Sequence, residues 1–321
     1  MLILANGPYI TCFYVFVVRT LFLAKGRPMK PTDYAILSKR QLSENVYMMR
    51  ILAPYIAAER KPGQFILLSV DESYGERIPL TIADADADAG SITIIFQKVG
   101  FTTTQLAAME VGDHLAAVLG PLGQPTHVSK VGTVVCVGGG IGVAPMHPIA
   151  KAFKAAGNRL ICILGARNKD LVILEDEIRA FADEVIVCTD DGSAGRKALV
   201  TAPLKELCEQ TPRPGLSIAI GPPIMMKFCA ETVRPYGVPL IVSLNTIMVD
   251  GTGMCGGCRV TVGGETKFVC VDGPEFDGLK VDFDGMMKRL QAYRPQEQRM
   301  AAEGGEHQCR MMAQAKQLEK K

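Results

Sequence analysis

The feature that most constrains the fold is a change near Gly123 in what separates the apolar runs of the chain. Before it, six short apolar runs between Tyr34 and Leu119 alternate with turns, which predicts a small antiparallel barrel. After it, apolar runs alternate with helical stretches, which predicts a parallel sheet covered by helices. From Pro239 the chain becomes rich in glycine and cysteine. The fold class predicted is therefore α/β plus β, in three parts.

These changes also set the expected domain boundaries. They predict a barrel at 30–125, a Rossmann-like domain at 126–238, a small cysteine-rich domain at 239–290 and a charged tail at 291–321. The ADADADAG stretch at 83–90 is expected to form a polar hairpin loop.

The first 28 residues are apolar, yet Arg19 and Pro8 interrupt them, and neither a positive leading region nor a small-residue cleavage site is evident. A conventional polar start follows at Met29. We expect residues 1–29 to be a mis-assigned start or a disordered extension, with a membrane anchor or a signal peptide as alternatives.

The charge balance narrows the classes of partner. Lysine and arginine total 35 against 33 acidic residues, so no excess charge favours nucleic acid or an anionic membrane. Cys136, Cys162 and Cys188 lie in apolar runs, where a reduced thiol behaves as a small hydrophobe. This pattern favours a reducing cytoplasm over a disulfide framework.

The strongest chemical signal is a set of metal-ligating residues, Asp250, Cys255, Cys258 and Cys270. Plant-type [2Fe–2S] ligation runs C-x₄-C-x₂-C with a later cysteine, and this spacing is kept here with aspartate in the first position. Glycines around the cysteines allow the backbone to fold tightly about a metal centre. A structural zinc site and a redox pair are the alternatives, and Cys309 in the tail is a competing fourth ligand.

A glycine-rich turn follows the apolar run VVCV at 134–137. A strand that delivers glycines to a helix start is typical of pyrophosphate binding, because the helix dipole attracts the charge and bare backbone permits close approach. A plain strand-to-helix turn is the alternative. The residues concerned are Gly138, Gly139, Gly140, Gly142 and Pro145.

A third pattern lies inside the barrel region, in RIPLT at 77–81. Arg77 and Thr81 are four residues apart in an extended segment, so they point to one side and could hold a flavin's ribityl and phosphate groups. An ordinary exposed arginine is the alternative. Downstream, Gly100 and Thr102, Thr103 and Thr104 precede a helix, as an N-cap or a second phosphate contact.

Taken together, these motifs resemble the ferredoxin–NADP reductase superfamily. The likeness rests on R-x-P-L-T, which includes Pro79 and Leu80, on G-x-x-T, on LGPLG at 119–123, on GGGIGVAP, on GPP with Gly221 and Pro222, and on the cysteine loop. It covers about residues 30–290. Two departures are the Ile220 that stands where a cysteine often precedes Gly-Pro, and the lack of a terminal aromatic residue.

Within the superfamily the chain is similar to electron-transfer subunits of dihydroorotate dehydrogenase and, more closely, to the small subunit of NADH-dependent reduced ferredoxin:NADP⁺ oxidoreductase, because Asp250 replaces a cysteine. This resemblance implies FAD, a [2Fe–2S] cluster and NAD(H), with NADP(H) as the alternative. It also implies a larger partner with FAD and iron–sulfur centres, similar to the small subunit of glutamate synthase, and indirect exchange with ferredoxin. No residue of this chain is assigned a catalytic role.

Cations that could accept a 2′-phosphate follow two predicted strands of the nucleotide domain: Arg167, Lys169, Arg196 and Lys197. They could equally be solvated loop charges. Other functions left open are an oxygenase-type reductase, which usually keeps four cysteines, and a zinc module without redox activity.

Overall fold

The computed structural model describes residues 33–71 and 76–302. The expected extension at 1–29 and the alternative ligand Cys309 therefore lie outside the described residues. Within the described ranges, none of the helices has the length and apolar character needed to cross a bilayer.

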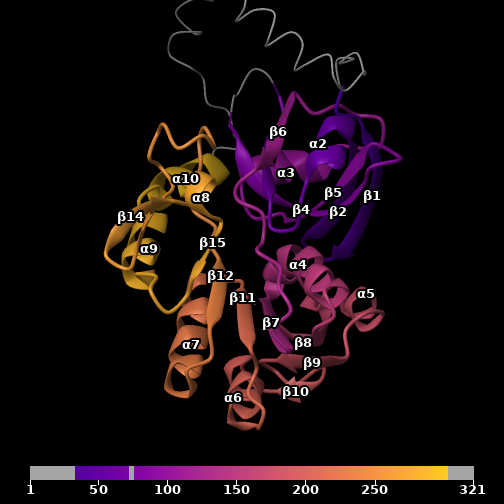
Figure 1. Ribbon diagram of the computed structural model, residues 1–321. Helices are drawn as coiled ribbons and strands as arrows, with labels where there is room; N and C mark the ends of the chain where they lie inside the picture. The colour runs from indigo at the N-terminus through magenta and orange to yellow at the C-terminus, as the bar shows by residue number, and fades with distance from the viewer. Residues whose placement is uncertain (1–32, 72–75, 303–321) are drawn as a thin grey trace, which may run out of the picture. The chain divides into compact units, whose positions relative to one another are not determined.

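The first part of the chain forms the predicted antiparallel barrel sheet (Figure 1). Its spatial order is β1-β2-β5-β4-β3-β6, with the short helices α2 (Pro54–Glu59) and α3 (Phe101–Ala108) beside it. The strands are β1 (Ile36–Ser43), β2 (Val46–Leu52), β3 (Phe65–Ser69), β4 (Ile78–Asp86), β5 (Ser91–Gln97) and β6 (Ala117–Leu122).

The prediction that all of residues 83–90 form a loop was wrong. β4 continues to Asp86, where Ala85 pairs with Ile92 and Asp86 pairs with Ser91 of β5. Ladder hydrogen bonds with a strongly apolar neighbour outweigh the low strand propensity of aspartate. Only the turn between Asp86 and Ser91 is free of the ladder.

The edges of this sheet approach each other at the start of β1. Ala35 forms a bridge with His114, and the Ile36 amide donates to the Asp113 carbonyl at 2.8 Å. Closure in this way leaves fewer unpaired strand edges. The interior is filled by buried aliphatic and aromatic side chains, among them Ile66, Leu68, Ile82, Ile92, Ile94 and Phe96.

The second sheet is mainly parallel, in the order β10-β9-β8-β7-β11-β12-β15, and only β15 runs antiparallel to its neighbour. β12 and β15 lie in the range 239–290, so the sheet continues beyond the boundary expected at residue 238. The strands are β7 (Thr133–Gly139), β8 (Arg159–Ala166), β9 (Glu184–Thr189), β10 (Arg196–Lys197), β11 (Leu216–Ile220), β12 (Leu240–Ser243) and β15 (Glu275–Asp277).

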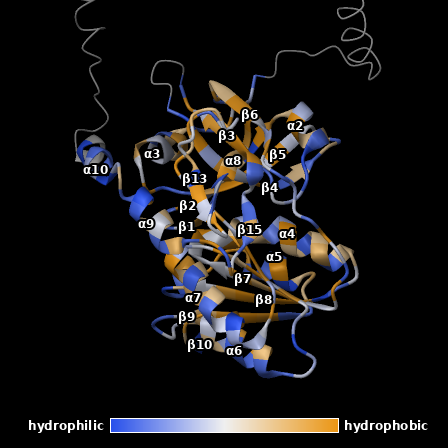
Figure 2. Cartoon of the chain, turned by 60° about the vertical axis from the view of Figure 1, so that its left-hand side comes forward, coloured by the Kyte–Doolittle hydropathy of each residue, from blue (hydrophilic) through white to orange (hydrophobic). Residues whose placement is uncertain are grey.

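Helices cover both faces of this sheet, as the alternation of side chains requires. Val134 and Cys136 of β7 pack with Phe153 on one face, whereas Val135 packs with Leu204 on the other. Figure 2 shows the resulting apolar strands between more polar helix surfaces. The helices are α4 (Val143–Ala155) and α5 (Glu175–Arg179) on the first face, and α6 (Thr201–Glu209) and α7 (Pro223–Val233) on the second.

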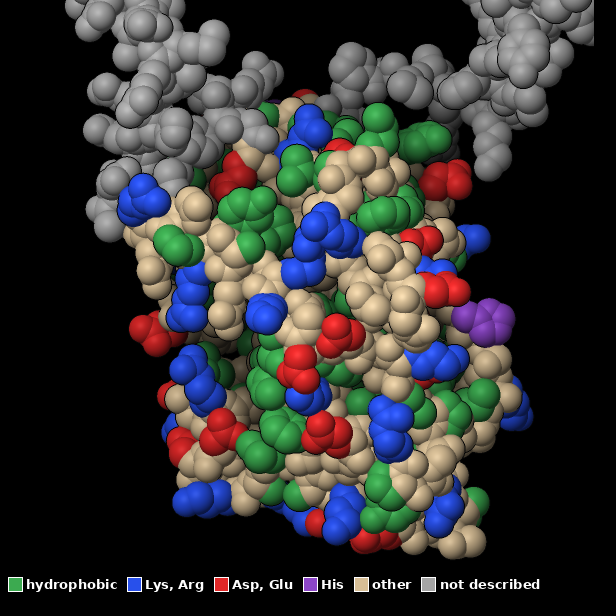
Figure 3. Space-filling view, turned by 90° about the vertical axis from the view of Figure 1, so that its left-hand side faces the viewer, with side chains coloured by type: hydrophobic (Ala, Val, Ile, Leu, Met, Phe, Trp, Pro, Cys, Tyr) green, Lys and Arg blue, Asp and Glu red, His purple; other side chains and the backbone are tan. Residues whose placement is uncertain are grey.

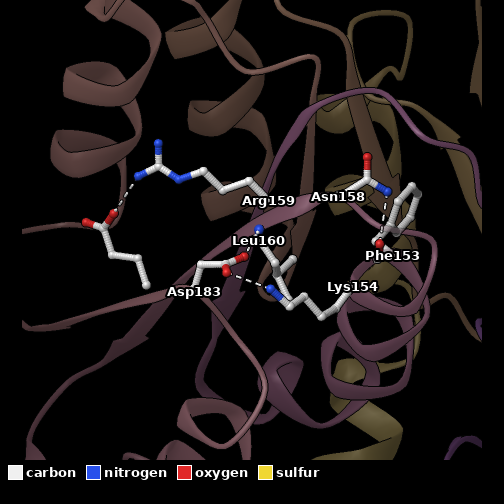
Figure 4. A network of polar contacts seen from close by, with 7 residues as sticks. Phe153, Lys154, Asn158, Arg159, Leu160 and Asp183 are labelled. Atoms are coloured by element: carbon white, nitrogen blue, oxygen red, sulfur yellow. Dashed lines mark hydrogen bonds and ion pairs between the residues drawn. The ribbon is translucent and has the colours of Figure 1, made fainter.

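A polar network anchors the C-terminal end of α4 to this sheet (Figure 4). The Asp183 carboxylate accepts from the Leu160 amide at 2.7 Å and from Lys154 Nζ at 2.6 Å. These bonds, the amide first, lower the pKa of Asp183. Asn158 Nδ2 donates to the Phe153 carbonyl at 2.9 Å, which satisfies a helix end. With this end fixed, the N-terminus of α4 faces the opposite, carboxyl edge of the sheet.

The last part of the described chain contains a small hairpin and three helices. Val260 and Phe283 belong to the same core as Phe65 of the barrel and Val242 of the second sheet, so this segment is packed against both. The elements are β13 (Arg259–Val262), β14 (Glu265–Phe268), α8 (Val269–Asp272), α9 (Phe283–Leu290) and α10 (Arg294–Ala302).

Candidate functional site

Three adjoining cavities lie where the barrel, the parallel sheet and the cysteine segment meet. We call them the sheet cavity, of about 730 Å³, the central cavity, of about 160 Å³, and the helix cavity, of about 860 Å³. Asn245 lines both the sheet and central cavities, and its neighbour Thr246 lines the helix cavity. The short segment after β12 therefore touches all three.

The sheet cavity lies at the carboxyl ends of β7, β8 and β11, where open α/β sheets bind ligands. Gly139 and Gly140 line it together with Gly221 and Pro222. Gly140 has a φ of +55°, and a Cβ built on it would meet no heavy atom within 4 Å. A left-handed glycine beside open space is suited to the close approach of a pyrophosphate.

Of the other predicted residues of the glycine turn, one serves packing and two line a cavity. A Cβ on Gly138 would lie 2.9 Å from Val143 Cγ2, so this glycine permits packing of α4 against β7 rather than lining a cavity. Gly142 and Pro145 line the central cavity. Pro145 lies within the first turn of α4, which begins at Val143.

Charged residues at the far end of the sheet cavity bear on nucleotide choice. Arg167 and Asp190 line it. Arg196 is held by Glu206 through two hydrogen bonds of 2.6 and 2.8 Å, an arrangement that engages its guanidinium in a fork. Lys169 and Lys197 are not among the residues that line this cavity.

The central cavity joins the barrel to the glycine turn. It is lined by Pro79, Leu80 and Thr81 of β4 together with Ile141 and Ile220. Arg77, by contrast, is exposed just before β4 begins. The structure thus brings Thr81 to the cavity, but it does not place Arg77 among the residues that line any of the three.

The helix cavity contains the start of α3. Gly100, Thr102 and Thr103 line it, whereas Thr104 is exposed and does not. Thr103 Oγ1 accepts from the Gly100 amide at 2.9 Å, so this side chain is a helix cap. Thr102 is only 5% exposed, and its hydroxyl has no hydrogen-bond partner within the described chain.

A second buried hydroxyl in this cavity was missed by the sequence analysis. Thr246 is 9% exposed, lines the helix cavity and has no hydrogen-bond partner among the described residues. Buried polar groups are nearly always paired, so such orphans indicate an absent ligand or water. No pattern marks Thr246 in the sequence, since a single threonine four residues before Asp250 is unremarkable.

The predicted metal ligands lie in the loop that precedes β13 and at α8. Cys258 Sγ donates to Cys270 Sγ at 3.3 Å, and both residues are buried. Burial, followed by this hydrogen bond, raises the pKa of the Cys270 thiol to about 12. Such thiols need the charge of a metal ion to become thiolate ligands.

The other two predicted ligands are more exposed. Cys255 Sγ accepts from the Gly257 amide at 3.4 Å. The Asp250 carboxylate accepts from the Thr252 and Cys255 amides, each at 2.7 Å, and these bonds lower its pKa. Within residues 33–71 and 76–302, no three such side chains converge as a metal site. The structure therefore pairs the sulfurs of Cys258 and Cys270, and it ties the Asp250 carboxylate to the backbone of Cys255.

These features fit the cofactors that the motifs imply. Amide hydrogens reach two of the sulfurs, since the Cys270 amide also donates to Cys258 Sγ at 3.5 Å, and soft thiolates are the usual ligands of iron–sulfur clusters. The two orphaned hydroxyls and the bare Gly140 turn provide the donors and the space that phosphate-containing ligands require.

The barrel, the parallel sheet and the cysteine segment define a class of protein, the ferredoxin–NADP reductase fold with a C-terminal iron–sulfur domain. The family model for the iron–sulfur cluster binding domain of dihydroorotate dehydrogenase B matches residues 245–282. The chain is 48% identical over 262 residues to the Thermotoga maritima "dihydroorotate dehydrogenase B (NAD(+)), electron transfer subunit homolog", covering 82% of this chain and 92% of that protein. It belongs to the family of dihydroorotate dehydrogenase B electron-transfer subunits and their homologues.

Two further comparisons support this placement. The chain is 33% identical over 264 residues to the electron transfer subunit of Fusobacterium nucleatum, covering 80% of this chain and all of that protein. A chain in the solved structure of an NADH-dependent reduced ferredoxin-NADP oxidoreductase is 46% identical, with a TM-score of 0.79 over 84% of this chain and 97% of that one. The predicted resemblance and fold class are confirmed.

Proposed function

We propose that this chain is the electron-transfer subunit of an NADH-dependent reduced ferredoxin–NADP oxidoreductase. One observation carries the proposal: Cys255 of the cluster loop and Thr102 of α3 line the same helix cavity, which adjoins the central and sheet cavities. The nicotinamide site in the sheet cavity, the flavin site in the central cavity and the metal centre at the cysteine loop are then neighbours. FAD, when bound, converts hydride exchange with NAD(P)H into single-electron exchange with a [2Fe–2S] cluster.

The protein's own residues contribute to this function by positioning the nucleotide and the flavin. Gly139 and Gly140 admit the pyrophosphate of the nucleotide, and the N-terminus of α4 presents its dipole to that charge. Thr81 and Pro145 both line the cavity assigned to the flavin ring. Ile220 contributes an apolar wall there, at the position where a cysteine often precedes Gly-Pro.

The charges of the sheet cavity favour NAD(H) over NADP(H). Asp190 can accept hydrogen bonds from a ribose and would repel a 2′-phosphate. Of the four cations considered for that phosphate, Arg196 is engaged by Glu206 and only Arg167 lines the cavity.

The proposed partner is a larger subunit that carries FAD and iron–sulfur centres, and through which ferredoxin exchanges electrons. Val249, just before the cluster loop, and Met254, within it, are 59% and 89% exposed. Exposed apolar side chains beside a redox centre suit a protein interface. Figure 3 shows hydrophobic side chains exposed between charged ones on this side of the molecule. We place the complex in the cytoplasm.

Dihydroorotate dehydrogenase B is the second candidate, because the named relatives include its electron-transfer subunits. Asp250, in place of a cysteine, favours the first. Both candidates are tested by adding NADH to the purified chain with either large subunit. Reduction of NADP⁺ that requires both NADH and reduced ferredoxin, and that occurs only with the glutamate-synthase-like subunit, supports the proposal, whereas orotate reduction with the dehydrogenase subunit contradicts it.

A further inference from the structure

Two arginines hold the loop between the first two cysteines of the proposed metal centre. Arg259 Nη1 donates to the Gly256 carbonyl at 3.2 Å, and Arg289 Nη2 donates to the Gly257 carbonyl at 3.1 Å. The first arginine begins β13, directly after the loop, and the second lies on α9. Guanidinium groups stay charged at every physiological pH, so this loop carries two permanent positive charges at its backbone.

Helix α9 presents Arg289 to the loop. Lys227 of α7 donates to both carboxylate oxygens of Asp284 at 2.8 Å, which fixes the first turn of α9. Met286 is buried three residues before Arg289, and residues at this spacing share a helix face. The guanidinium therefore extends from the inner side of the helix, which packs against β13.

Gly257 connects this arginine to a sulfur atom. Its carbonyl accepts from Arg289, and its amide donates to Cys255 Sγ at 3.4 Å. A hydrogen bond to a ligand sulfur stabilises the reduced, more negative state of an iron–sulfur cluster, and a nearby positive charge does the same. Both effects of Arg289 have the same sign, since each raises the reduction potential.

The charges of the two arginines are not paired within the described ranges. Neither Arg289 nor Arg259 forms an ion pair with a carboxylate there. Glu76 and Glu297 line the same cavity, but burial and then the charge of Glu297 raise the pKa of Glu76, whereas a cation close by would lower it. Arg289 is half-buried and Arg259 is exposed, so solvent screens the charge of Arg289 less.

We propose that Arg289, assisted by Arg259, raises the reduction potential of the [2Fe–2S] cluster and holds the Gly257 amide on the Cys255 ligand. Reduction adds one electron, and thus one negative charge, which the guanidiniums stabilise. The cluster then accepts electrons from the flavin more readily. Arg289 is a positioning residue, because it acts through Gly257 as well as through its charge. The inference rests on the proposed function, since it concerns the cluster of that function.

The experiment is an anaerobic redox titration of the purified full chain, in which electron paramagnetic resonance reports the reduced cluster at each potential. Arg289→Met should lower the ratio of reduced to oxidised cluster at a fixed potential about tenfold, a shift of about 59 mV for a one-electron couple. Arg289→Lys keeps the charge and should change this ratio less than about twofold. Arg259→Met should lower it about threefold, because solvent screens that charge more.

Lys288→Met is the matched control. Lys288 precedes Arg289 in the last turn of α9, is exposed and lines none of the three cavities. This variant removes the same charge from the molecule and should leave the ratio unchanged. If Arg289→Met loses iron, Arg289→Gln, which keeps a donor but no charge, replaces it with the same expected shift.

An unchanged potential in the uncharged variant of Arg289 would overturn the inference. Equal shifts in this variant and Lys288→Met would also overturn it, as would equal shifts in this variant and Arg289→Lys. Each of these results leaves the proposed function intact. An unaltered chain that holds no [2Fe–2S] cluster would contradict the proposed function itself.

Discussion

At the scale of single residues, Gly140 is the position where backbone geometry and ligand chemistry coincide. Its φ of +55° and its open surroundings predict that Gly140→Val abolishes flavin reduction by NADH. Reduction by dithionite should persist, because the flavin does not depend on this turn. The measurement is anaerobic stopped-flow absorbance with each reductant.

Gly237 supplies the matched control for backbone strain. It has a φ of +66°, a Cβ on it would also meet no heavy atom within 4 Å, and it lines none of the three cavities. Gly237→Val should therefore lower the free energy of unfolding by a similar amount to Gly140→Val, about 1–2 kcal/mol, and it should leave the rate of flavin reduction by NADH unchanged. Equal loss of rate in both variants would attribute the effect to strain, and loss of flavin from Gly140→Val would mean that the turn belongs to the flavin site.

Asp250 has two competing roles that its variants separate. As a cluster ligand it should be replaceable by cysteine, with a shifted reduction potential, but not by asparagine, whose amide is a poor ligand for iron. As a loop cap it accepts from the Thr252 amide through one carboxylate oxygen and from the Cys255 amide through the other, so asparagine would keep one of these bonds and cysteine, a weak acceptor, would keep neither well. We expect Asp250→Cys to retain the cluster and Asp250→Asn to lose it, as measured by iron content and by the electron paramagnetic resonance of the reduced protein.

Cys309, outside the described residues, provides the contrasting variant. Cys309→Ser should change neither iron content nor potential. If Cys309→Ser loses the cluster and Asp250→Asn keeps it, the aspartate is a cap and the preference for the ferredoxin–NADP oxidoreductase subunit loses its main support.

Some site residues were predictable from the sequence because their chemistry needs a local pattern. The glycine turn and the C-x-x-C loop are of this kind. Thr246 was not predictable, because only long-range packing brings it to the cavity that the start of α3 also lines. For Arg77 a local pattern was misleading. The four-residue spacing predicted a pair with Thr81, but Arg77 is exposed just before β4 begins.

At the scale of elements, β15 carries a half-buried carboxyl, Glu275, into the contact between barrel and sheet. Glu275 Oε1 accepts from Thr126 Oγ1 at 2.6 Å, and β15 pairs with β12. Burial raises the pKa of Glu275 above its usual 4.5. Protonation of Glu275 therefore contributes to the free energy of unfolding. This contribution is complete at a pH below the unfolded-state pKa and is lost as the pH rises through the folded-state pKa.

Glu275→Gln, which cannot ionise but can still accept from Thr126, should therefore become more stable relative to the unaltered chain as the pH rises. The measurement compares unfolding temperatures from pH 4.5 to pH 8, where a difference of 1 kcal/mol corresponds to about 2–4 °C. Glu44→Gln, in the exposed turn before β2, should show no such trend. Parallel curves for Glu275→Gln and the unaltered chain would contradict the account.

Elements were predictable where an apolar run pairs with another close in the sequence. The six barrel strands and β7, β8, β9 and β11 all follow from their apolar runs. β15 has only three residues, and no apolar run distinguishes it; its place is set by pairing with β12, more than thirty residues earlier in the chain. Helix α7 had no counterpart among the expected elements, because its first residues, GPP, match a ligand motif, although proline is also common in the first turn of a helix.

At the scale of the whole molecule, the segment after β12 connects the three cavities to the cluster loop. Asn245 lines the sheet and central cavities, Thr246 and Ile247 line the helix cavity, and Asp250 and Cys255 follow within a few residues. The adjacency of barrel, sheet and cysteine loop was predictable only through the family resemblance, because composition and periodicity define the parts but not their contacts.

The most direct test of the central claim is an anaerobic titration of the purified chain with NADH, followed by visible absorbance and electron paramagnetic resonance. The chain should contain about one FAD, two iron and two acid-labile sulfides. NADH should bleach the flavin band, and electrons should appear on the cluster. A chain that contains zinc instead of iron, or whose flavin and cluster both stay oxidised in excess NADH and NADPH, would contradict the account.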